Sequence, residues 1–291
     1  MEYITEFAAA KINLTLQVTG KRSDGYHMLQ SLVVFAGVGD YLRFSPAEDL
    51  SLEITGPFAS SLTTDPNNLV LAAARKLQEQ LGKNCASQTV PGAVIRLEKN
   101  LPVASGIGGG SADAAAALRG LLRLWEADLP ESDLTSLALE LGADVPVCLS
   151  SSCRWMEGIG EVLTPGPELP KLFAVLVNPG VPVSTPGVFK ALKGNFMPAS
   201  GKPSAIPALA ELIGYLENTP NDLQAPAISQ RGIVSEVLTE LRGSHGCLFS
   251  AMSGSGATCY GLFDTAEDAE SAATTLSVEN PGWWVAPTFL R

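Results

Sequence analysis

The residues that stand out chemically are Lys11, a glycine-rich stretch from Gly106 to Ser111, and Asp144. Glycine adopts positive φ and carries no Cβ, so the backbone N–H groups of such a stretch can close around an anion. Ser111 is a natural N-cap, and a helix that begins there would direct its positive end toward the same anion. A phosphate fits this arrangement best, although a glycine run before a helix is also a common flexible connection.

Known phosphate motifs differ from this stretch, which reads LPVASGIGGGSADAAAA over residues 101–117. It lacks the Gly-Lys-Ser/Thr of a Walker A loop, and no acidic residue about 20 positions later completes a dinucleotide-binding fingerprint. A second glycine-rich loop, from Met252 to Ala257, connects two predicted strands near the C-terminus. This loop is either a plain turn or a second wall of the same phosphate site.

Lys11 and Asn13 project from the same face of a predicted strand, because side chains two residues apart in a strand share a face. This arrangement suits a cation and an amide aimed into a cleft, whereas the ordinary alternative is a surface lysine at a strand end. Asp144 lies at a predicted helix-to-strand junction among apolar neighbours, where a carboxylate is either a helix cap or a catalytic group. The residues alone leave these alternatives open.

Tyr26 and His27 directly follow Asp24-Gly25, which is a hairpin signal. A histidine beside a tyrosine at a turn can stack on a ring and hydrogen-bond to it. A partly exposed turn histidine is the simple alternative, and the spacing does not decide between the two.

The composition indicates a globular chain, since 46% of its 291 residues are hydrophobic and 17% are charged. The formal net charge of -11 weighs against nucleic acid and anionic membrane surfaces as partners. No segment reaches 18 apolar residues and the N-terminus carries no signal peptide, so we expect a cytoplasmic protein. Because no C-x-x-C pair occurs, we expect free thiols at the cysteines, which are Cys85, Cys148, Cys153, Cys247 and Cys259.

Hydrophobic periodicity predicts strands and helices in both halves of the chain. Strands are expected over 4–18, 29–35, 40–45, 50–55, 94–98, 145–149, 172–177, 247–251, 258–263 and 282–287. Helices are expected directly after the glycine-rich stretch and over 69–81, 130–141, 185–192, 207–217, 229–242 and 265–276. Serine, glycine and proline gather between residues 150 and 165, which predicts two domains, 1–155 and 156–291.

Together these motifs resemble the GHMP kinase superfamily of galactokinases, homoserine kinases, mevalonate kinases and phosphomevalonate kinases. Within it, the chain is similar to the family of 4-diphosphocytidyl-2-C-methyl-D-erythritol kinases of the non-mevalonate isoprenoid pathway. The matching segments follow the family's order along nearly the whole chain: AAAKINLTLQVTGKRSDGYHMLQSL at 8–32, LPVASGIGGGSADAAAAL at 101–118, LGADVPVCL at 141–149, NPGVPVSTPGVF at 178–189, NDLQAPA at 221–227 and AMSGSGATCYGLF at 251–263.

The resemblance implies a fold of two α+β domains with the active site in the cleft between them. It also implies transfer of the γ-phosphoryl group of ATP, with Mg²⁺, to the 2-hydroxyl of a small substrate, a methylerythritol linked to cytidine diphosphate. Asp144 would accept the hydroxyl proton, with the cation of Lys11 beside it. Other matching positions would bind the substrate (Asn13, Tyr26, His27, Thr185 and Phe189) or ATP (Asn68, Lys99, Pro102, Gly106, Gly108, Gly109, Gly110 and Ser111). The Mg²⁺ ligands stay unassigned, and a monomer or a homodimer is expected.

Two other functions stay open. A kinase of the same superfamily that acts on mevalonate or homoserine would have no use for Tyr26-His27, a pair suited to stacking on a base. A non-catalytic nucleotide or sugar-phosphate sensor on the same scaffold would have no need of Asp144 as a hydroxyl base.

Overall fold

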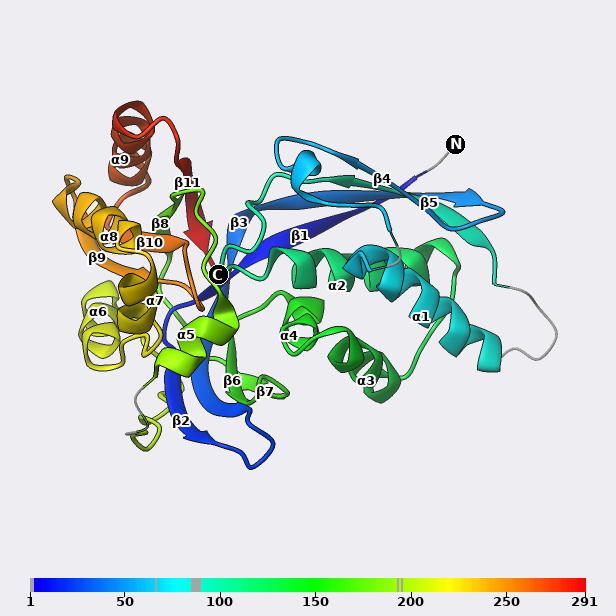
Figure 1. Cartoon of the computed structure of the whole chain (residues 1–291), viewed down its shortest axis with the longest axis horizontal. Coiled ribbons are helices and arrows are strands. Elements are labelled where there is room, and N and C mark those ends of the chain that lie inside the picture. Colours follow the sequence, from blue (N-terminus) through cyan, green and yellow to red (C-terminus); the bar gives the residue numbers. More distant parts are fainter. Residues whose placement is uncertain (1–2, 66, 85–89, 193, 195) are drawn as a thin grey trace. The chain divides into compact units, whose positions relative to one another are not determined.

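The computed structural model describes residues 3–65, 67–84, 90–192, 194 and 196–291 (Figure 1). Its contacts divide the chain into two compact units, each assembled from separate segments. Unit 1 comprises Met1–Ala10, Gly39–Val103 and Gly108–Ser151, and unit 2 comprises Lys11–Val38, Ala104–Ile107 and Ser152–Arg291. The predicted division into domains 1–155 and 156–291 treats each domain as contiguous, and it stays a prediction.

Unit 1 combines a sheet with helices. Strand β5 (Gly92–Glu98) pairs antiparallel with the second half of the long strand β3 (His27–Ala47) and parallel with β4 (Ser51–Thr55). Strand β1 (Ile4–Asn13), which begins in this unit, also pairs with β3. The helical elements are η1 (Ala59–Ser61), α1 (Leu69–Asn84), α2 (Gly109–Leu124), α3 (Glu131–Leu141) and α4 (Val145–Ser150).

Helix α2 packs closely on strand β3 because its inward face is built of small residues. Ala112 and the run Ala114 to Ala117 are all buried. The ring of Phe44 on β3 lies so near Gly120 that a Cβ at this glycine would come within 2.2 Å of the ring. A larger residue at position 120 would therefore displace the helix that follows the glycine-rich stretch.

Unit 2 contains the first half of β3, which pairs antiparallel with β2 (Gln17–Lys21) and β6 (Arg154–Gly158). Strand β7 (Val162–Pro165) pairs with β6. Further strands run antiparallel in the order β11-β8-β10-β9, and β11 joins them to β3. Their bounds are β8 (Leu172–Asn178), β9 (Cys247–Met252), β10 (Cys259–Phe263) and β11 (Trp284–Leu290).

Helices cover the C-terminal strands of unit 2. Helix α8 (Ile233–Gly243) packs on β9 and β10, and α9 (Ala266–Glu279) packs on β8 and β11 (Figure 1). Buried side chains from strands and helices, including Val175, Val237 and Leu276, form the core of this unit. Removal of this apolar surface from water is the main favourable term in its folding. The other helices described in unit 2 are α5 (Thr185–Ala191), α6 (Leu209–Asn218) and α7 (Gln224–Gln230).

Some predicted elements differ from the structure. The apolar run 145–149, predicted as a strand, is part of helix α4, where Pro146 is tolerated because the first turn needs no N–H donor. The strands predicted over 29–35 and 40–45 are one strand, β3, and the strand predicted over 4–18 ends at Asn13 and is followed by β2. The prediction misses β6, β7 and α7, which are too short for a clear periodic pattern.

The cysteines that the structure describes, Cys148, Cys153, Cys247 and Cys259, are free thiols, whereas Cys85 lies outside the described residues. Burial raises the pKa of the Cys153 thiol to about 11, which keeps it protonated and unreactive at neutral pH. Across the described ranges, no helix has both the length and the apolar character that crossing a bilayer requires.

Candidate active site

The glycine-rich stretch runs from β5 into α2 and bends at residues with positive φ. Gly106 has φ 78° and Gly108 has φ 63°, values that glycine adopts without a steric penalty. Gly108 is the N-cap of α2, so the prediction of Ser111 as the N-cap is wrong, and Ser111 lies inside the first turn. The N–H of Ala112 donates to the Gly108 carbonyl at 2.8 Å, so the N–H groups that precede it have no acceptor within the helix. This geometry suits an anion at the start of α2.

In unit 2, the middle of this stretch packs against the second glycine-rich loop, which connects β9 and β10. A Cβ at Gly106 would lie 2.7 Å from the carbonyl oxygens of Gly256 and Ser253, so only glycine permits this approach. Thr258 N–H donates to the Ser105 carbonyl at 3.0 Å, and the Ser253 hydroxyl donates to the Gly106 carbonyl at 3.2 Å. The two loops are therefore in direct contact within unit 2, and the role of the second loop as a wall of a phosphate site stays a prediction.

Strand β1 brings Lys11 and Asn13 to the same pair of loops. The Lys11 N–H donates to the Ile107 carbonyl at 2.9 Å, and the Asn13 N–H donates to the Ser253 hydroxyl at 3.1 Å. Lys11 is 3% exposed and Asn13 is 1% exposed, which overturns the alternative of a surface lysine. A cation and an amide thus lie buried in unit 2 on a strand that is bonded to both glycine-rich loops.

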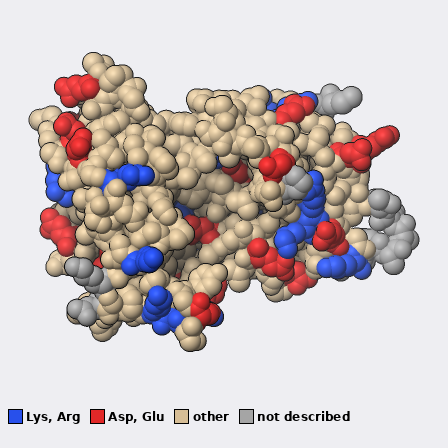
Figure 2. Space-filling model, viewed as in Figure 1, with Lys and Arg blue, Asp and Glu red and all other residues tan. Residues whose placement is uncertain are grey.

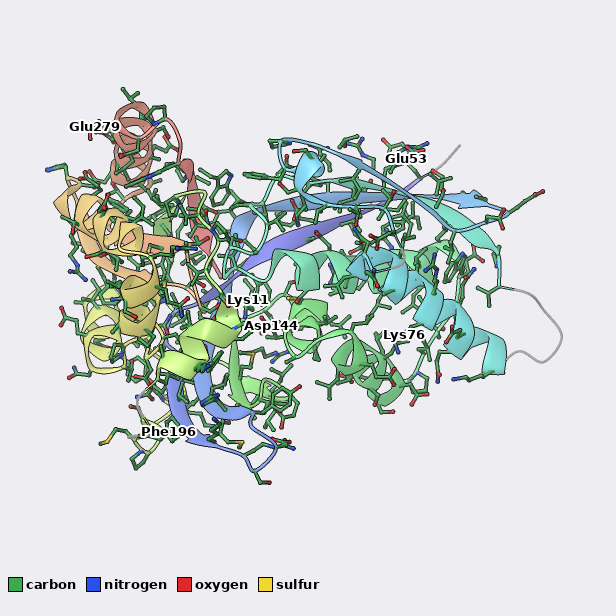
Figure 3. The ribbon with its side chains drawn as sticks, viewed as in Figure 1. Lys11, Glu53, Lys76, Asp144, Phe196 and Glu279 are labelled. Carbon is green, nitrogen blue, oxygen red and sulfur yellow. The ribbon has the colours of Figure 1, made fainter. Side chains whose placement is uncertain are left out.

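Asp144, in unit 1, directly precedes helix α4 (Figure 3). It occupies the N-cap position, but its side chain accepts no hydrogen bond from the first turn, and Pro146 in that turn has no N–H to donate. The alternative of a helix cap is therefore wrong. The half-buried carboxylate makes no side-chain cap hydrogen bond to α4, and its catalytic role stays a prediction.

Arg119 of α2 holds the helix that carries Asp144. Its guanidinium donates to the carbonyls of Cys148 and Leu149, at 2.9 and 3.3 Å, in the last turn of α4. It also pairs with Glu6 of β1 at 3.0 Å. Because the cation satisfies carbonyl groups at a helix C-terminus, it stabilises α4 and ties it to α2 and β1.

Lys99, directly after β5, lies in a buried cluster of charges that we call the ion triad: Lys99, Asp40 and Asp113. The ammonium of Lys99 lies 2.6 Å from a carboxylate oxygen of each acid, and the three side chains are at most 3% exposed. Asp40 also accepts from the N–H groups of Asn100 and Leu101, at 2.6 and 2.8 Å. The ion triad thus joins β3, the entry to the glycine-rich stretch, and α2.

Titration within the ion triad follows from its burial. Burial opposes the charged form of Lys99, but the two nearby carboxylates outweigh it and raise the pKa of Lys99. Burial raises the pKa of Asp113 to about 8, against the pull of Lys99 and with the added repulsion of Asp40. The ammonium of Lys99 is therefore paired with two carboxylates inside unit 1, and its predicted contact with ATP stays a prediction.

His27, at the start of β3, stacks on Phe189 of α5 with ring centroids 5.0 Å apart and planes inclined by 26°. Phe196 meets the same imidazole edge-on, with centroids 5.9 Å apart (Phe196 is labelled in Figure 3). Burial, together with the charge of Lys21, lowers the pKa of His27 and so keeps the imidazole neutral at pH 7. A neutral imidazole offers one donor and one acceptor to a base. Tyr26, next in the chain, is 61% exposed.

The other predicted contacts lie as follows. Thr185 shares a hydrogen bond of 2.7 Å with Ser255 of the second glycine-rich loop. The side chain of Asn68 accepts from the Val70 N–H at 2.9 Å, which caps the start of α1. Pro102 is buried at the entry to the glycine-rich stretch. Binding of substrate or ATP by these residues stays a prediction.

Sequence reasoning missed the residues that hold the others in place: Asp40, Asp113, Phe196, Ser31 and Ser253. Asp113, Ser31 and Ser253 lie inside segments that match the family, but their residue types and spacing gave them no role, and Asp40 and Phe196 lie outside those segments. Ser253 also belongs to the second glycine-rich loop, and that position could have been a signal.

Acidic and basic side chains are interspersed on the face that Figure 2 shows. Among the described residues, no group of three or more His, Cys, Asp or Glu side chains is arranged to hold a metal ion.

Comparison with known proteins gives a consistent result. Residues 68–152 match the family described as GHMP kinases N terminal domain, and residues 204–279 match GHMP kinases C terminal. A protein of Paramagnetospirillum magneticum, named 4-diphosphocytidyl-2-C-methyl-D-erythritol kinase, is 53% identical over 286 residues, which are 97% of each chain. A protein of Rhodospirillum rubrum with the same name is 48% identical over 97% of this chain and 91% of its own length.

Solved structures agree. A crystal structure of 4-(cytidine 5'-diphospho)-2C-methyl-D-erythritol kinase superposes with a TM-score of 0.78 and 32% identity, covering 98% of each chain. The mevalonate kinase of L. major superposes with a TM-score of 0.62 and 16% identity, covering 98% of this chain and 95% of its own, which shows a shared fold alone.

Proposed function

Since the chain belongs to the GHMP kinases, in the family of 4-diphosphocytidyl-2-C-methyl-D-erythritol kinases, and is thus a small-molecule kinase, we propose that it transfers the γ-phosphoryl group of ATP to the 2-hydroxyl of 4-diphosphocytidyl-2-C-methyl-D-erythritol. The structural observation that carries this choice of substrate is the neutral imidazole of His27 stacked on Phe189. Substrates without a base, such as mevalonate and homoserine, have no use for such a pair.

The start of α2 binds the phosphates of ATP in this proposal. The N–H groups of Gly109, Gly110 and Ser111 and the positive end of the helix supply the attraction that a chain of net charge -11 otherwise lacks. Mg²⁺ would be held chiefly by the phosphates and would neutralise their charge, and the hydroxyl of Ser111, in the first turn of α2, would contact the phosphates or the Mg²⁺.

Asp144 accepts the proton of the attacking hydroxyl, and Lys11 supplies positive charge to the same group. Phosphoryl transfer depends on positioning and on stabilisation of charge more than on covalent participation of the protein. An aspartate carboxylate and a buried lysine are side chains suited to these tasks. A water-soluble substrate of this kind also fits the expected cytoplasmic location.

Release of ADP tests the proposal. The protein is incubated with ATP and Mg²⁺ and with one of three alcohols: the diphosphocytidyl compound, mevalonate or homoserine. We expect ADP release with the first compound alone. Equal release with mevalonate or homoserine would reassign the substrate, and ATP binding without release in any mixture would favour the sensor.

His27→Ala is expected to raise the KM of the diphosphocytidyl substrate by about 10- to 100-fold, the range that loss of a stacked and hydrogen-bonded ring contact gives. The KM of ATP should stay within about twofold of the starting value. His245→Ala is the matched control, because His245 is exposed in a turn of the same unit and is the other histidine of the chain. Equal changes in both KM values would contradict a role of His27 in recognition of the base.

A further inference from the structure

The side chain of Asn13 is held in one orientation by a short chain of hydrogen bonds in unit 2. Its Nδ2 lies 2.7 Å from the hydroxyl of Ser31, and that hydroxyl lies 2.5 Å from the carbonyl oxygen of Thr15. Ser31 is completely buried, and Asn13 and Thr15 are at most 2% exposed. The contacts therefore persist without competition from bulk water.

The chemistry of these groups fixes which end of the Asn13 amide faces Ser31. A carbonyl oxygen can only accept, so the single proton of the Ser31 hydroxyl is committed to Thr15. The hydroxyl can then only accept from Asn13, and the amide atom beside it must be the NH₂ group. The amide oxygen Oδ1 necessarily points away from Ser31.

Oδ1 of Asn13 is a buried acceptor for which the described part of the chain supplies no donor. A Cβ added to Gly254 would lie 3.4 Å from this oxygen, so Oδ1 faces the second glycine-rich loop. Buried polar atoms are nearly always hydrogen-bonded, and each exception calls for a partner. The partner required here is a donor, such as a hydroxyl, and a phosphate oxygen would be repelled.

We propose that Ser31 is a positioning residue for the alcohol substrate: it orients Asn13 so that Oδ1 accepts a hydrogen bond from a substrate hydroxyl. The inference rests on the proposed function for the identity of that substrate. It adds that Asn13 distinguishes hydroxyl groups from phosphate oxygens, and that the distinction is set by Ser31, which has no substrate contact of its own.

Substitution of Ser31 tests this role. In Ser31→Ala, Asn13 loses the hydroxyl that fixes its amide. We therefore expect kcat/KM for the diphosphocytidyl substrate to fall about 10-fold, the change expected on loss of one well-placed hydrogen bond. The KM of ATP should change by less than about twofold. Ser31→Thr keeps the hydroxyl and should retain most of the kcat/KM for the alcohol.

Thr15→Val is the matched control. The Thr15 hydroxyl is buried in the same network and accepts from the Leu32 N–H at 2.9 Å, whereas the Asn13 amide donates to the hydroxyl of Ser31. This variant should lower the melting temperature about as much as Ser31→Ala while leaving the KM of the alcohol unchanged. An equal loss of kcat/KM in both variants, or none in Ser31→Ala, would overturn the proposal.

A second measurement does not depend on turnover. In the protein without ligands, the NH₂ group of Asn13 should exchange its protons slowly by NMR, and exchange should accelerate at least about 10-fold in Ser31→Ala as the hydrogen bond is lost. Unchanged exchange would overturn the orientation by Ser31. If exchange accelerates while the starting protein leaves the diphosphocytidyl compound unphosphorylated, the proposed function fails and the orientation by Ser31 stands.

Discussion

Asp144→Asn is expected to lower kcat by about 1,000-fold, within the range that general-base catalysis contributes. The amide has nearly the shape of the carboxylate but cannot accept the proton of the attacking hydroxyl. The Kd of ATP, measured by calorimetry, should stay within about twofold, because the proposed phosphate site lies at the start of α2 and does not include this side chain.

Asp128→Asn is the control for this variant, since Asp128 is an exposed carboxylate in the loop between α2 and α3. It should leave both kcat and ATP binding unchanged. Turnover of Asp144→Asn at a rate comparable to that of the starting protein would remove Asp144 from the role of base.

Lys99→Met is expected to lower the free energy of unfolding by about 3–5 kcal/mol, the usual cost of removing one partner from a buried ion pair. The variant leaves Asp40 and Asp113 facing each other in an interior where their carboxylates are at most 3% exposed. Protonation of Asp113, whose pKa is about 8 even beside Lys99, relieves part of the repulsion at pH 7, so the loss should grow above pH 8, where the carboxylate ionises in the starting protein. Denaturant unfolding of the two proteins at pH 7 and pH 9 measures both effects.

The neighbouring strand offers a matched comparison. Arg96 of β5 pairs with Glu53 at 2.7 Å, but both side chains are about half exposed. Arg96→Met should therefore cost no more than about 1 kcal/mol, as expected for an ion pair in water. A loss in Lys99→Met no greater than that in Arg96→Met would show that the ion triad does not stabilise unit 1.

The sequence was sufficient for features that depend on local chemistry. The Gly106–Ser111 run predicts a turn into a helix, which helix α2 confirms. The family and its fold were also predicted from spaced motifs, and the relatives confirm them. These features could be predicted because each motif is encoded within a few consecutive residues.

Features that depend on distant partners were not predictable. The run around Pro146 fits a short strand or a short helix equally well, and contact of α4 with Arg119 stabilises the helix. In the sequence, Lys99 resembles a ligand-binding lysine. Only the fold shows that it pairs with Asp40, which lies 59 positions away in the chain. Ser31 lies in the matching segment 8–32 without a predicted role, since its importance arises from its position beside Asn13.

Phosphorus NMR of the reaction mixture tests the central claim most directly. With ATP, Mg²⁺ and the diphosphocytidyl substrate, we expect a new phosphomonoester resonance that grows in step with ADP, while the two phosphorus signals of the cytidine diphosphate linkage persist. Inorganic phosphate as the only new signal besides those of ADP, or loss of the diphosphate linkage, would contradict transfer of the γ-phosphoryl group to the substrate hydroxyl.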